Sequence, residues 1–510
     1  MRRHRVAALS VVVVALVAAA ALSAASAANR APASTHAAAG SITIAIGGEP
    51  STLDPLVRDD GNERAVTQSI FETLMGRTPD GKRLYPKLAI AAPKRVAPSA
   101  WRFRLRPNIK FTDGEPFNAD SVVASVKHVL DPKANSEQVG YLGSLKGAKK
   151  VNNLTVDILT KGTDPILPSR MYWLRMIPAK WQTLSDFANK PVGTGPYVFS
   201  EWARGDHITL TANPSYWGSP KPSIQTVTFK FVPEGSTQTA GLAAGNFNLI
   251  TNLIPEDAKR APKAIAVRST EHPIFILNAR PGSQVTADPR VRQAMNYAVD
   301  KNAIADKLFL GYATVDAGQL LSPSAFGFDP KTKAYAYDVA KAKQLIEQAG
   351  ATGKTVNLVG ESGRWLKDRE LIESAAQFWR AIGLEVDVKF YAFPQYLNRL
   401  FDQKNRPDVI FVSSSNELYD ADRPFTTYYE PSGIGASNAD KQLQKWIDSA
   451  RTELNVNKRT AQYHAAIRKA RAQAYFVWLV NYQGLWGMSK NLSWQPRSDG
   501  FIFVNTMKLT

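Results

Sequence analysis

The sequence predicts an α/β protein that combines a β-rich region with a second region in which strands and helices alternate. In the β-rich region, residues 197–202, 208–211 and 226–232 predict three strands. Further along, an expected strand at 355–359, helix at 371–382 and strand at 384–390 form a βαβ unit with a right-handed crossover. Each region is too large to be an appendage of the other. Ligands of such proteins tend to bind between the lobes.

The first 27 residues have the three parts of a secretory signal peptide. Residues 1–5 are basic, residues 6–22 are almost entirely Val, Ala and Leu, and Ala25-Ser26-Ala27 offers a small-residue cleavage site. A transmembrane anchor is the less favoured alternative because the apolar run is Ala-rich and gives way to small and polar residues. The arginine pair at 2–3 leaves the twin-arginine route open beside the general secretory one. Residues 28–40 are of low complexity and predict a disordered lead-in, so we expect a periplasmic or extracellular mature protein.

The composition limits how the mature protein is stabilised and what it contacts. The 510 residues contain no cysteine, which excludes disulfides, thiolate metal sites and a lipid-anchor cysteine. A chain of this length with 44% apolar residues can be stable through core burial alone. The formal net charge is +19, but the basic residues are dispersed and form neither runs nor a recognised nucleic-acid module. We therefore expect no nucleic-acid partner.

Helix starts and stops can also be read from the sequence. Asp120 is the expected N-cap of a helix with a valine-rich stripe, and Asp288 and Asp300 are expected to cap two later helices. Asp338 starts another predicted helix, and Gly350 is its expected C-terminal glycine. These signals place several helices around the predicted βαβ unit.

The sequence contains no motif that requires an enzyme. Its six histidines never occur at the short spacing of a metal site on one helix, and no Gly-x-Ser-x-Gly elbow is present. The Gly350–Thr355 stretch, Gly-Ala-Thr-Gly-Lys-Thr, has two residues between its glycines where a phosphate-binding loop needs four, so a helix cap and a turn are favoured. A carboxylate pair from distant positions remains possible. We predict a protein that is not an enzyme and has no cofactor and no metal site.

Nine short motifs then occur in a fixed order along the chain. They are Ile-Ala-Ile-Gly-Gly-Glu-Pro-Ser-Thr-Leu-Asp-Pro at 44–55, Phe-Glu-Thr-Leu at 71–74, Pro-Lys-Leu-Ala at 86–89, Trp-Arg-Phe-Arg-Leu-Arg-Pro at 101–107, Phe-Thr-Asp-Gly-Glu-Pro-Phe at 111–117, Gly-Thr-Gly-Pro-Tyr at 193–197, Asn-Pro-Ser-Tyr-Trp at 213–217, Phe-Ile-Leu-Asn at 275–278 and Asp-Pro-Arg-Val-Arg-Gln-Ala at 288–294. In this order they resemble the family 5 extracytoplasmic solute-binding proteins of ABC importers, which include dipeptide-, oligopeptide- and nickel-binding proteins. The resemblance spans nearly the whole mature chain.

The resemblance implies a type II periplasmic-binding-protein-like fold, in which two lobes are joined by a hinge and an extra α+β domain is inserted. Ligand binding would shift such a protein towards a closed form that the permease of the importer recognises. We expect a monomer. The implied boundaries are 41–58, 190–272 and 482–510 for lobe I, 59–189 for the inserted domain, and 273–481 for lobe II, which is α/β.

The resemblance also implies a ligand anchor. In peptide-binding members, an acidic residue of the α/β lobe pairs with the α-ammonium group of the ligand. In the corresponding stretch at 412–422, Ser414 replaces the usual tryptophan and Glu417 falls where the aspartate is expected. An ammonium ion buried without a partner is costly, so a carboxylate here has a clear physical use. Glu417 is therefore the candidate amine anchor, with Ser414, Asn416 and Tyr419 as neighbouring candidates; an ordinary solvated loop is the alternative.

Other candidate ligand contacts are weaker, and each has an ordinary structural explanation beside the functional one. Glycine backbone can approach a ligand closely, an arginine can bind a carboxylate, and aromatic rings can form a wall or simply pack in the core. The residues concerned are Gly47, Gly48, Arg364, Trp365, Tyr482 and Trp486.

The leading hypothesis is a receptor for a small peptide or a similar amine-bearing solute. The altered surroundings of Ser414 keep an oligosaccharide or a metal chelate open as the ligand. A secreted hydrolase and a basic envelope protein that binds an anionic polymer are the alternatives from other classes.

Overall fold

The computed structural model describes residues 40–282, 285–402, 404–433 and 435–510, and it begins almost directly with strand β1 (Ser41–Ile46). The predicted signal peptide at 1–27 lies outside these residues, as does the predicted lead-in apart from Gly40. Within them, no helix has the length and apolar character needed to cross a bilayer.

An eight-stranded sheet contains β1 and the predicted strands of the β-rich region. Ile42, Ile44 and Ile46 of β1 are buried, as the alternation predicts for one face of a strand. β1 pairs in parallel with β10 on one side and β11 on the other, while most neighbouring pairs are antiparallel. The remaining strands are β8 (Tyr197–Ala203), β9 (His207–Ala212), β10 (Thr226–Phe231), β11 (Leu249–Ile250), β12 (Lys263–Arg268), β19 (Val480–Met488) and β14 (Ala313–Val315), which pairs with β19.

A five-stranded sheet forms the core of the α/β region. The predicted βαβ unit is confirmed, because β15 and β16 are parallel neighbours joined through helix α9 (Asp368–Arg380). The strand order is β16-β15-β17-β13-β18, with antiparallel pairs on both sides of β13. Its strands are β13 (His272–Leu277), β15 (Thr355–Gly360), β16 (Glu385–Phe390), β17 (Val409–Ser414) and β18 (Phe476–Trp478).

Helices cover both faces of this sheet. One apolar cluster packs α6 (Pro289–Ala298), α8 (Val339–Gln348) and α9 against one face, and a second packs α10 (Phe393–Phe401), α12 (Lys441–Thr452) and α13 (Val456–Ala472) against the other. Asp288, Asp300 and Asp338 accept backbone N–H bonds as N-caps, as predicted. Asp300 caps the short α7 (Lys301–Ala303), which continues as a π-helical turn to Leu308.

A four-stranded antiparallel sheet lies in the segment between β1 and β8. Its strands are β4 (Lys94–Ala97), β5 (Ala100–Arg104), β7 (Thr155–Thr160) and β6 (Leu145–Asn152), in that order. Helix α2 (Ala119–Leu130) packs on it, but the predicted cap is wrong. Asn118 is the N-cap, because its side chain accepts from the backbone N–H of Asp120 at 2.8 Å.

Three further helices of this segment matter for the site. They are α1 (Gly61–Ile70), the one-turn α3 (Val139–Leu142) and α4 (Leu167–Trp173). Short strands and helices complete the fold: β2 (Met75–Arg77), β3 (Leu84–Pro86), α5 (Gly235–Ala243), α11 (Asp422–Pro424), β20 (Leu492–Ser493) and β21 (Lys508–Leu509).

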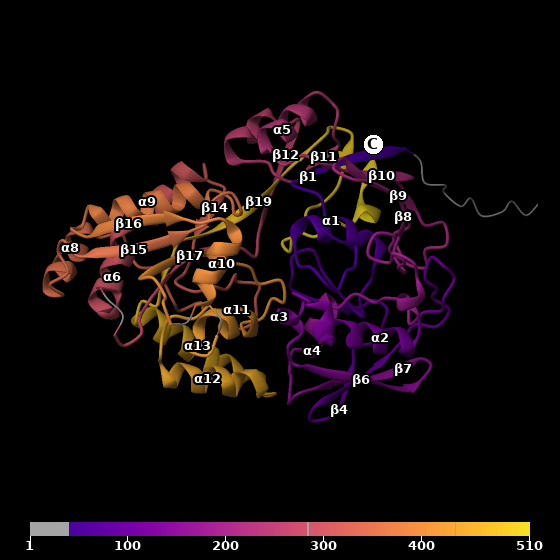
Figure 1. Ribbon diagram of the computed structural model, residues 1–510, viewed down its shortest axis with the longest axis horizontal. Coiled ribbons are helices and arrows are strands. Elements are labelled where there is room, and N and C mark those ends of the chain that lie inside the picture. The colour runs from indigo at the N-terminus through magenta and orange to yellow at the C-terminus, as the bar shows by residue number, and fades with distance from the viewer. Residues whose placement is uncertain (1–39, 283–284, 403, 434) are drawn as a thin grey trace, which may run out of the picture. The chain divides into compact units, whose positions relative to one another are not determined.

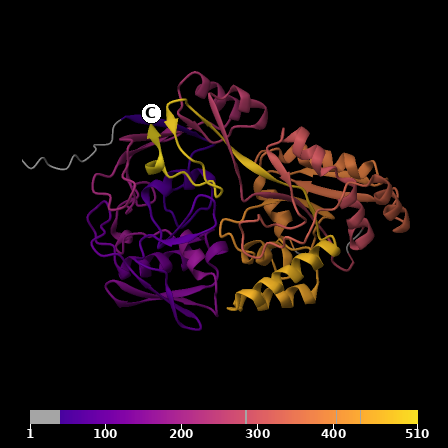
Figure 2. The same cartoon turned by 180° about the vertical axis from the view of Figure 1, so that it is seen from behind.

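Two crossings of the chain between the large sheets lie side by side, and the chain also leaves the five-stranded sheet for β14, which pairs with β19. β12 of the eight-stranded sheet is followed after three residues by β13 of the five-stranded sheet, and β18 is followed after Leu479 by β19. Figure 1 shows β19, in yellow, running from the five-stranded sheet to the eight-stranded sheet, and Figure 2 shows the same strand from behind. Two adjacent crossings suit a hinge between lobes, and the boundaries near 272 and 482 stay a prediction.

Candidate ligand-binding site

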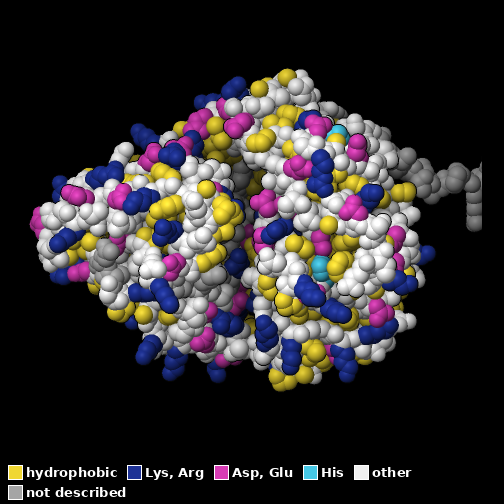
Figure 3. Space-filling view, viewed as in Figure 1, with side chains coloured by type: hydrophobic (Ala, Val, Ile, Leu, Met, Phe, Trp, Pro, Cys, Tyr) yellow, Lys and Arg dark blue, Asp and Glu magenta, His cyan; other side chains and the backbone are white. Residues whose placement is uncertain are grey.

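A cavity of ≈ 820 Å³ lies where the segment before β8 faces the α/β region. Figure 3 shows a groove down this face, with basic and acidic side chains along it and the remaining basic side chains dispersed. Such a volume falls in the range of small-molecule sites. The lining includes Asp59, Asp60, Gly61, Arg64, Glu137, Tyr141, Glu271, Arg364, Trp365, Phe393, Tyr396, Ser413, Ser414, Glu417, Arg423 and Tyr428.

Glu417 is held in this cavity by the loop that follows β17. Its side chain is buried, with 4% of the residue exposed, and its Oε2 accepts a hydrogen bond from the Tyr141 hydroxyl at 3.3 Å. The Tyr141 ring stacks on Trp173 with ring centroids 4.1 Å apart, so the phenol is fixed in place. The Glu417 carboxylate therefore directly contacts a side chain of the segment between β1 and β8.

Two arginines lie around the same carboxylate. Arg64, on α1, forms an ion pair with Asp59 at 2.5 Å, and the guanidinium of Arg423 lies 4.5 Å from the centre of the Tyr141 ring. Burial acts to lower the pKa of Arg64, but the charges of Asp59 and Glu417 outweigh it and raise that pKa above its usual value. The pKa of Arg423 is likewise raised, because Tyr141 and Glu417 outweigh the effect of burial. Both side chains thus stay cationic.

Glu271 supplies a second carboxylate that sequence reasoning missed. It lies in the crossing between β12 and β13, and its Oε2 accepts from the Ser413 hydroxyl at 2.6 Å. Burial, and then the charge of Glu417, raise the pKa of Glu271. No local pattern identifies such a residue, because Glu271 and Glu417 are brought together only by the pairing of β13 with β17.

Arg364 and Trp365 form another part of the cavity wall with the aromatic residues of α10. Their loop is fixed because the Asp368 carboxylate accepts the backbone N–H groups of Gly363, Arg364 and Trp365 at 2.9–3.0 Å. The Arg364 guanidinium lies 4.1 Å from the centre of the Phe393 ring. No ion pair to Arg364 occurs in the part of the chain that the structure describes, so its charge is available to an anionic group.

Four of the ten predicted ligand contacts line this cavity: Ser414, Glu417, Arg364 and Trp365. Tyr419 instead lines a neighbouring cavity and its hydroxyl lies 2.5 Å from Ser498 Oγ. Asn416 is buried beside Glu417 without lining the cavity, and its side-chain oxygen accepts from the backbone N–H of Asp420.

The other four predicted contacts are not among the residues that line the cavity. Gly47 and Gly48 face the side chains of Asn252 and Asn62. Tyr482 stacks on Phe309 with centroids 5.8 Å apart, and Trp486 packs edge-on against Trp494. For these two aromatic residues the core-packing explanation accounts for what the structure shows.

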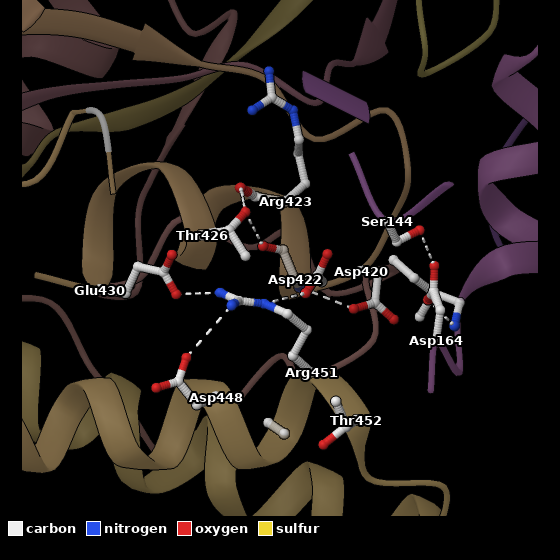
Figure 4. A network of polar contacts seen from close by, with 12 residues as sticks. Ser144, Asp164, Asp420, Asp422, Arg423, Thr426, Glu430, Asp448, Arg451 and Thr452 are labelled. Carbon is white, nitrogen blue, oxygen red and sulfur yellow. Dashed lines mark hydrogen bonds and ion pairs between the residues drawn. The ribbon is translucent and has the colours of Figure 1, made fainter. Parts of the chain in front are cut away.

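A buried network of ion pairs joins the inserted segment to the α/β region next to the cavity. Arg170 of α4 binds Asp164 at 2.7 Å on its own side and Asp422 at 2.6 Å on the other. Figure 4 shows Asp422 facing Arg451, which also reaches Glu430 and Asp448. We call Asp164, Arg170, Asp422, Glu430 and Arg451 the Asp422 network. Asp422 lies five residues after Glu417 in the chain. The loop that carries the candidate anchor is therefore also the loop through which the α/β region contacts α4.

The fold is that of the periplasmic binding proteins. The chain superimposes on CtaP, an ABC transporter substrate-binding protein of Listeria monocytogenes, with a TM-score of 0.82, 21% identity and coverage of 93% of this chain and 100% of that one. It superimposes on the periplasmic binding protein DppA of Helicobacter pylori, solved with the peptide STSA, with a TM-score of 0.76, 21% identity and coverage of 92% and 98%. These likenesses confirm the predicted type II fold class.

The family follows from the sequence comparisons. Residues 83–436 match the model of the bacterial extracellular solute-binding proteins, family 5 middle. A glutathione-binding protein GsiB of Pectobacterium atrosepticum is 27% identical over 360 residues, 69% of each chain. Protein XP55 of Streptomyces lividans is 30% identical over 328 residues, 61% of this chain and 58% of that protein. The chain belongs to the family 5 extracellular solute-binding proteins, as its ordered motifs indicated.

Proposed function

We propose that this protein is an exported receptor that captures a short peptide or a related amine-bearing solute in the 820 Å³ cavity and delivers it to an ABC importer. The single observation that carries this is the buried Glu417 carboxylate, which faces the cavity and has no ion pair in the described residues. A ligand ammonium group would supply the missing partner. Relatives that bind glutathione and a peptide have ligands of this class.

The rest of the cavity suits the other end of such a solute. Arg364 offers a cation on an aromatic wall, where a ligand carboxylate would bind, and the Phe393 and Tyr396 rings offer apolar surface between the two charged ends. A free amino acid derivative or a short peptide has this distribution of charge. We propose that the ligand is bound and released without chemical change.

The test is a thermal-shift screen of the mature protein against tripeptides with free amino termini and their N-acetylated counterparts. A tripeptide at 100 times its Kd stabilises the protein by about 2.7 kcal/mol, which gives a clear rise in Tm. We expect such rises for free amino termini only, and a loss of the response in Glu417→Gln. Rises only with oligosaccharides or metal chelates, or no rise with any peptide, would overturn the peptide assignment.

Mass spectrometry of the same mixtures separates a receptor from a hydrolase. A receptor leaves every tripeptide intact after prolonged incubation. Cleavage products that accumulate with turnover would show an enzyme instead.

A further inference from the structure

Glu271 lies in the part of the chain that joins the two large sheets, and its backbone is fixed there. Its N–H donates to Ser269 Oγ at 3.1 Å, and its carbonyl accepts from Asn481 Nδ2 at 2.8 Å. Asn481 belongs to β19, the other crossing strand, and also donates to the Ser269 carbonyl at 3.0 Å. The Ser269 hydroxyl donates to the Tyr482 carbonyl at 2.6 Å. The two crossing strands thus hold the Glu271 side chain in one direction.

That direction is into the ligand cavity, where Glu271 meets Glu417. Both side chains line the cavity, and neither has an ion pair in the described part of the chain. Ser413 donates one hydrogen bond to Glu271, and Tyr141 donates one to Glu417. The remaining charge at this end comes from Arg64, which Asp59 already pairs, and from Arg423. Arg364 also lines the cavity, but it lies over the Phe393 ring and forms no ion pair with either carboxylate.

The other groups around Glu271 do not supply the missing positive charge. His272 follows it in the chain, but both ring nitrogens of His272 are engaged, by Asp316 at 2.9 Å and Ser322 at 3.1 Å. Tyr428 and Tyr482 lie near enough to feel the Glu271 charge, and burial raises the pKa of both phenols, so they remain neutral. Neither Glu271 nor Glu417 therefore has an ion-pair partner among the described residues.

We propose that Glu271 and Glu417 hold the ammonium group of the ligand together, one from the crossing strand and one from the loop after β17. This rests on the proposed function and specifies its ligand as a charged primary amine. An ammonium group has three N–H donors, so it can bind both carboxylates at once. With a single carboxylate as its anchor, some of these donors would have no acceptor. Because the crossing strands fix Glu271 before the ligand arrives, the site does not have to order this side chain on binding.

Titration calorimetry with the tripeptide selected in the thermal-shift screen tests this inference. Charge-assisted hydrogen bonds are about twice as strong as neutral ones, so we expect Glu271→Gln to raise Kd about tenfold at pH 7.5. Glu347→Gln is the matched control, since Glu347 is exposed on α8 and far from the cavity lining. It should leave Kd unchanged.

The pH profile distinguishes a direct contact from a structural role. Because the pKa of the Glu271 carboxyl is raised, this carboxylate is protonated at a higher pH than an ordinary glutamate, and the wild-type Kd should rise towards that of Glu271→Gln as pH falls from 7.5 to 5. The rise of the wild-type Kd as pH falls is measured without a variant, so it tests the proposal even if Glu271→Gln folds poorly; a wild-type Kd that stays constant between pH 7.5 and pH 5 would overturn the two-carboxylate site. Equal Kd values for wild type and Glu271→Gln at both pH values would overturn the two-carboxylate site. If wild type binds no free-amine tripeptide at all, the proposed function fails instead.

Discussion

Asp422 offers the sharpest test of how the α/β region is held against the segment between β1 and β8. The change is Asp422→Asn, which keeps the side-chain shape and removes the negative charge that binds Arg170 at 2.6 Å. Both side chains are buried, at 7% and 4% exposure, so water does not replace the lost partner while the parts are in contact. This ion pair joins α4 to the α/β region in the arrangement that the structure describes, so its loss should favour arrangements in which the two are apart.

The magnitude follows from the surroundings of Arg170. Removing one partner of a buried ion pair costs about 3–5 kcal/mol. Asp164 still binds the Arg170 Nε at 2.7 Å, so part of the charge remains compensated. We therefore expect a loss below that range, about 2 kcal/mol, which corresponds to a Kd raised about 30-fold.

The assay combines calorimetry with small-angle X-ray scattering. Asp422→Asn should weaken tripeptide binding and raise the radius of gyration of the ligand-free protein. Asp448→Asn is the control, because Asp448 contacts Arg451 at 3.4 Å, is half exposed, and lies in the same α/β region as its partner. A double-mutant cycle with Arg170→Met isolates the coupling between the two residues. Unchanged Kd and unchanged radius in a folded Asp422→Asn protein would refute the reasoning.

Three further predictions follow from individual side chains. Arg364→Gln should raise Kd about tenfold for tripeptides with a free carboxylate and leave Kd for the tripeptide amides unchanged, as measured by calorimetry; equal losses for both would contradict a carboxylate contact. Trp379→Ala should lower the free energy of unfolding by about 3–5 kcal/mol in urea denaturation, because this fully buried indole donates to the Met295 carbonyl at 3.0 Å. Trp446 is only half-buried, so Trp446→Ala should lower the free energy of unfolding clearly less. Similar losses for the two variants would count against the assignment of Trp379 to the core. The raised pKa of Glu271 means that the folded protein binds more protons than the unfolded one, so its contribution to stability falls as pH rises from the usual carboxyl value to the raised one. The ligand-free Glu271→Gln protein should therefore have a higher Tm than wild type at pH 7 but not at pH 4. The same difference in Tm between variant and wild type at both pH values would contradict this.

Local sequence patterns predicted much of the fold because they encode local physics. The alternation at Ile42, Ile44 and Ile46 indicated β1, and the capping role of Asp338 fixed the start of α8. Asp120 was misread as a cap because Asn118, two residues earlier, has the same capping chemistry and the apolar stripe does not distinguish them. Sheet order depends on contacts between distant segments and was beyond local patterns.

The site residues, too, could be predicted only where a local pattern marks them. Glu417 and Ser414 could be found because a family motif marks their stretch, and Arg364 because it follows a predicted strand. Glu271 and Tyr141 could not, since each reaches the cavity through the pairing or packing of remote segments. Tyr482 and Trp486 were chosen for their aromatic character, which core packing uses as readily as ligand binding does.

A crystal structure of the mature protein with the selected tripeptide tests the central claim most directly. We expect the peptide ammonium nitrogen within hydrogen-bond distance of the Glu417 carboxylate and of Glu271, with the peptide inside the cavity lined by Arg364. A peptide bound with its amino terminus away from Glu417, or outside this cavity, would contradict the account.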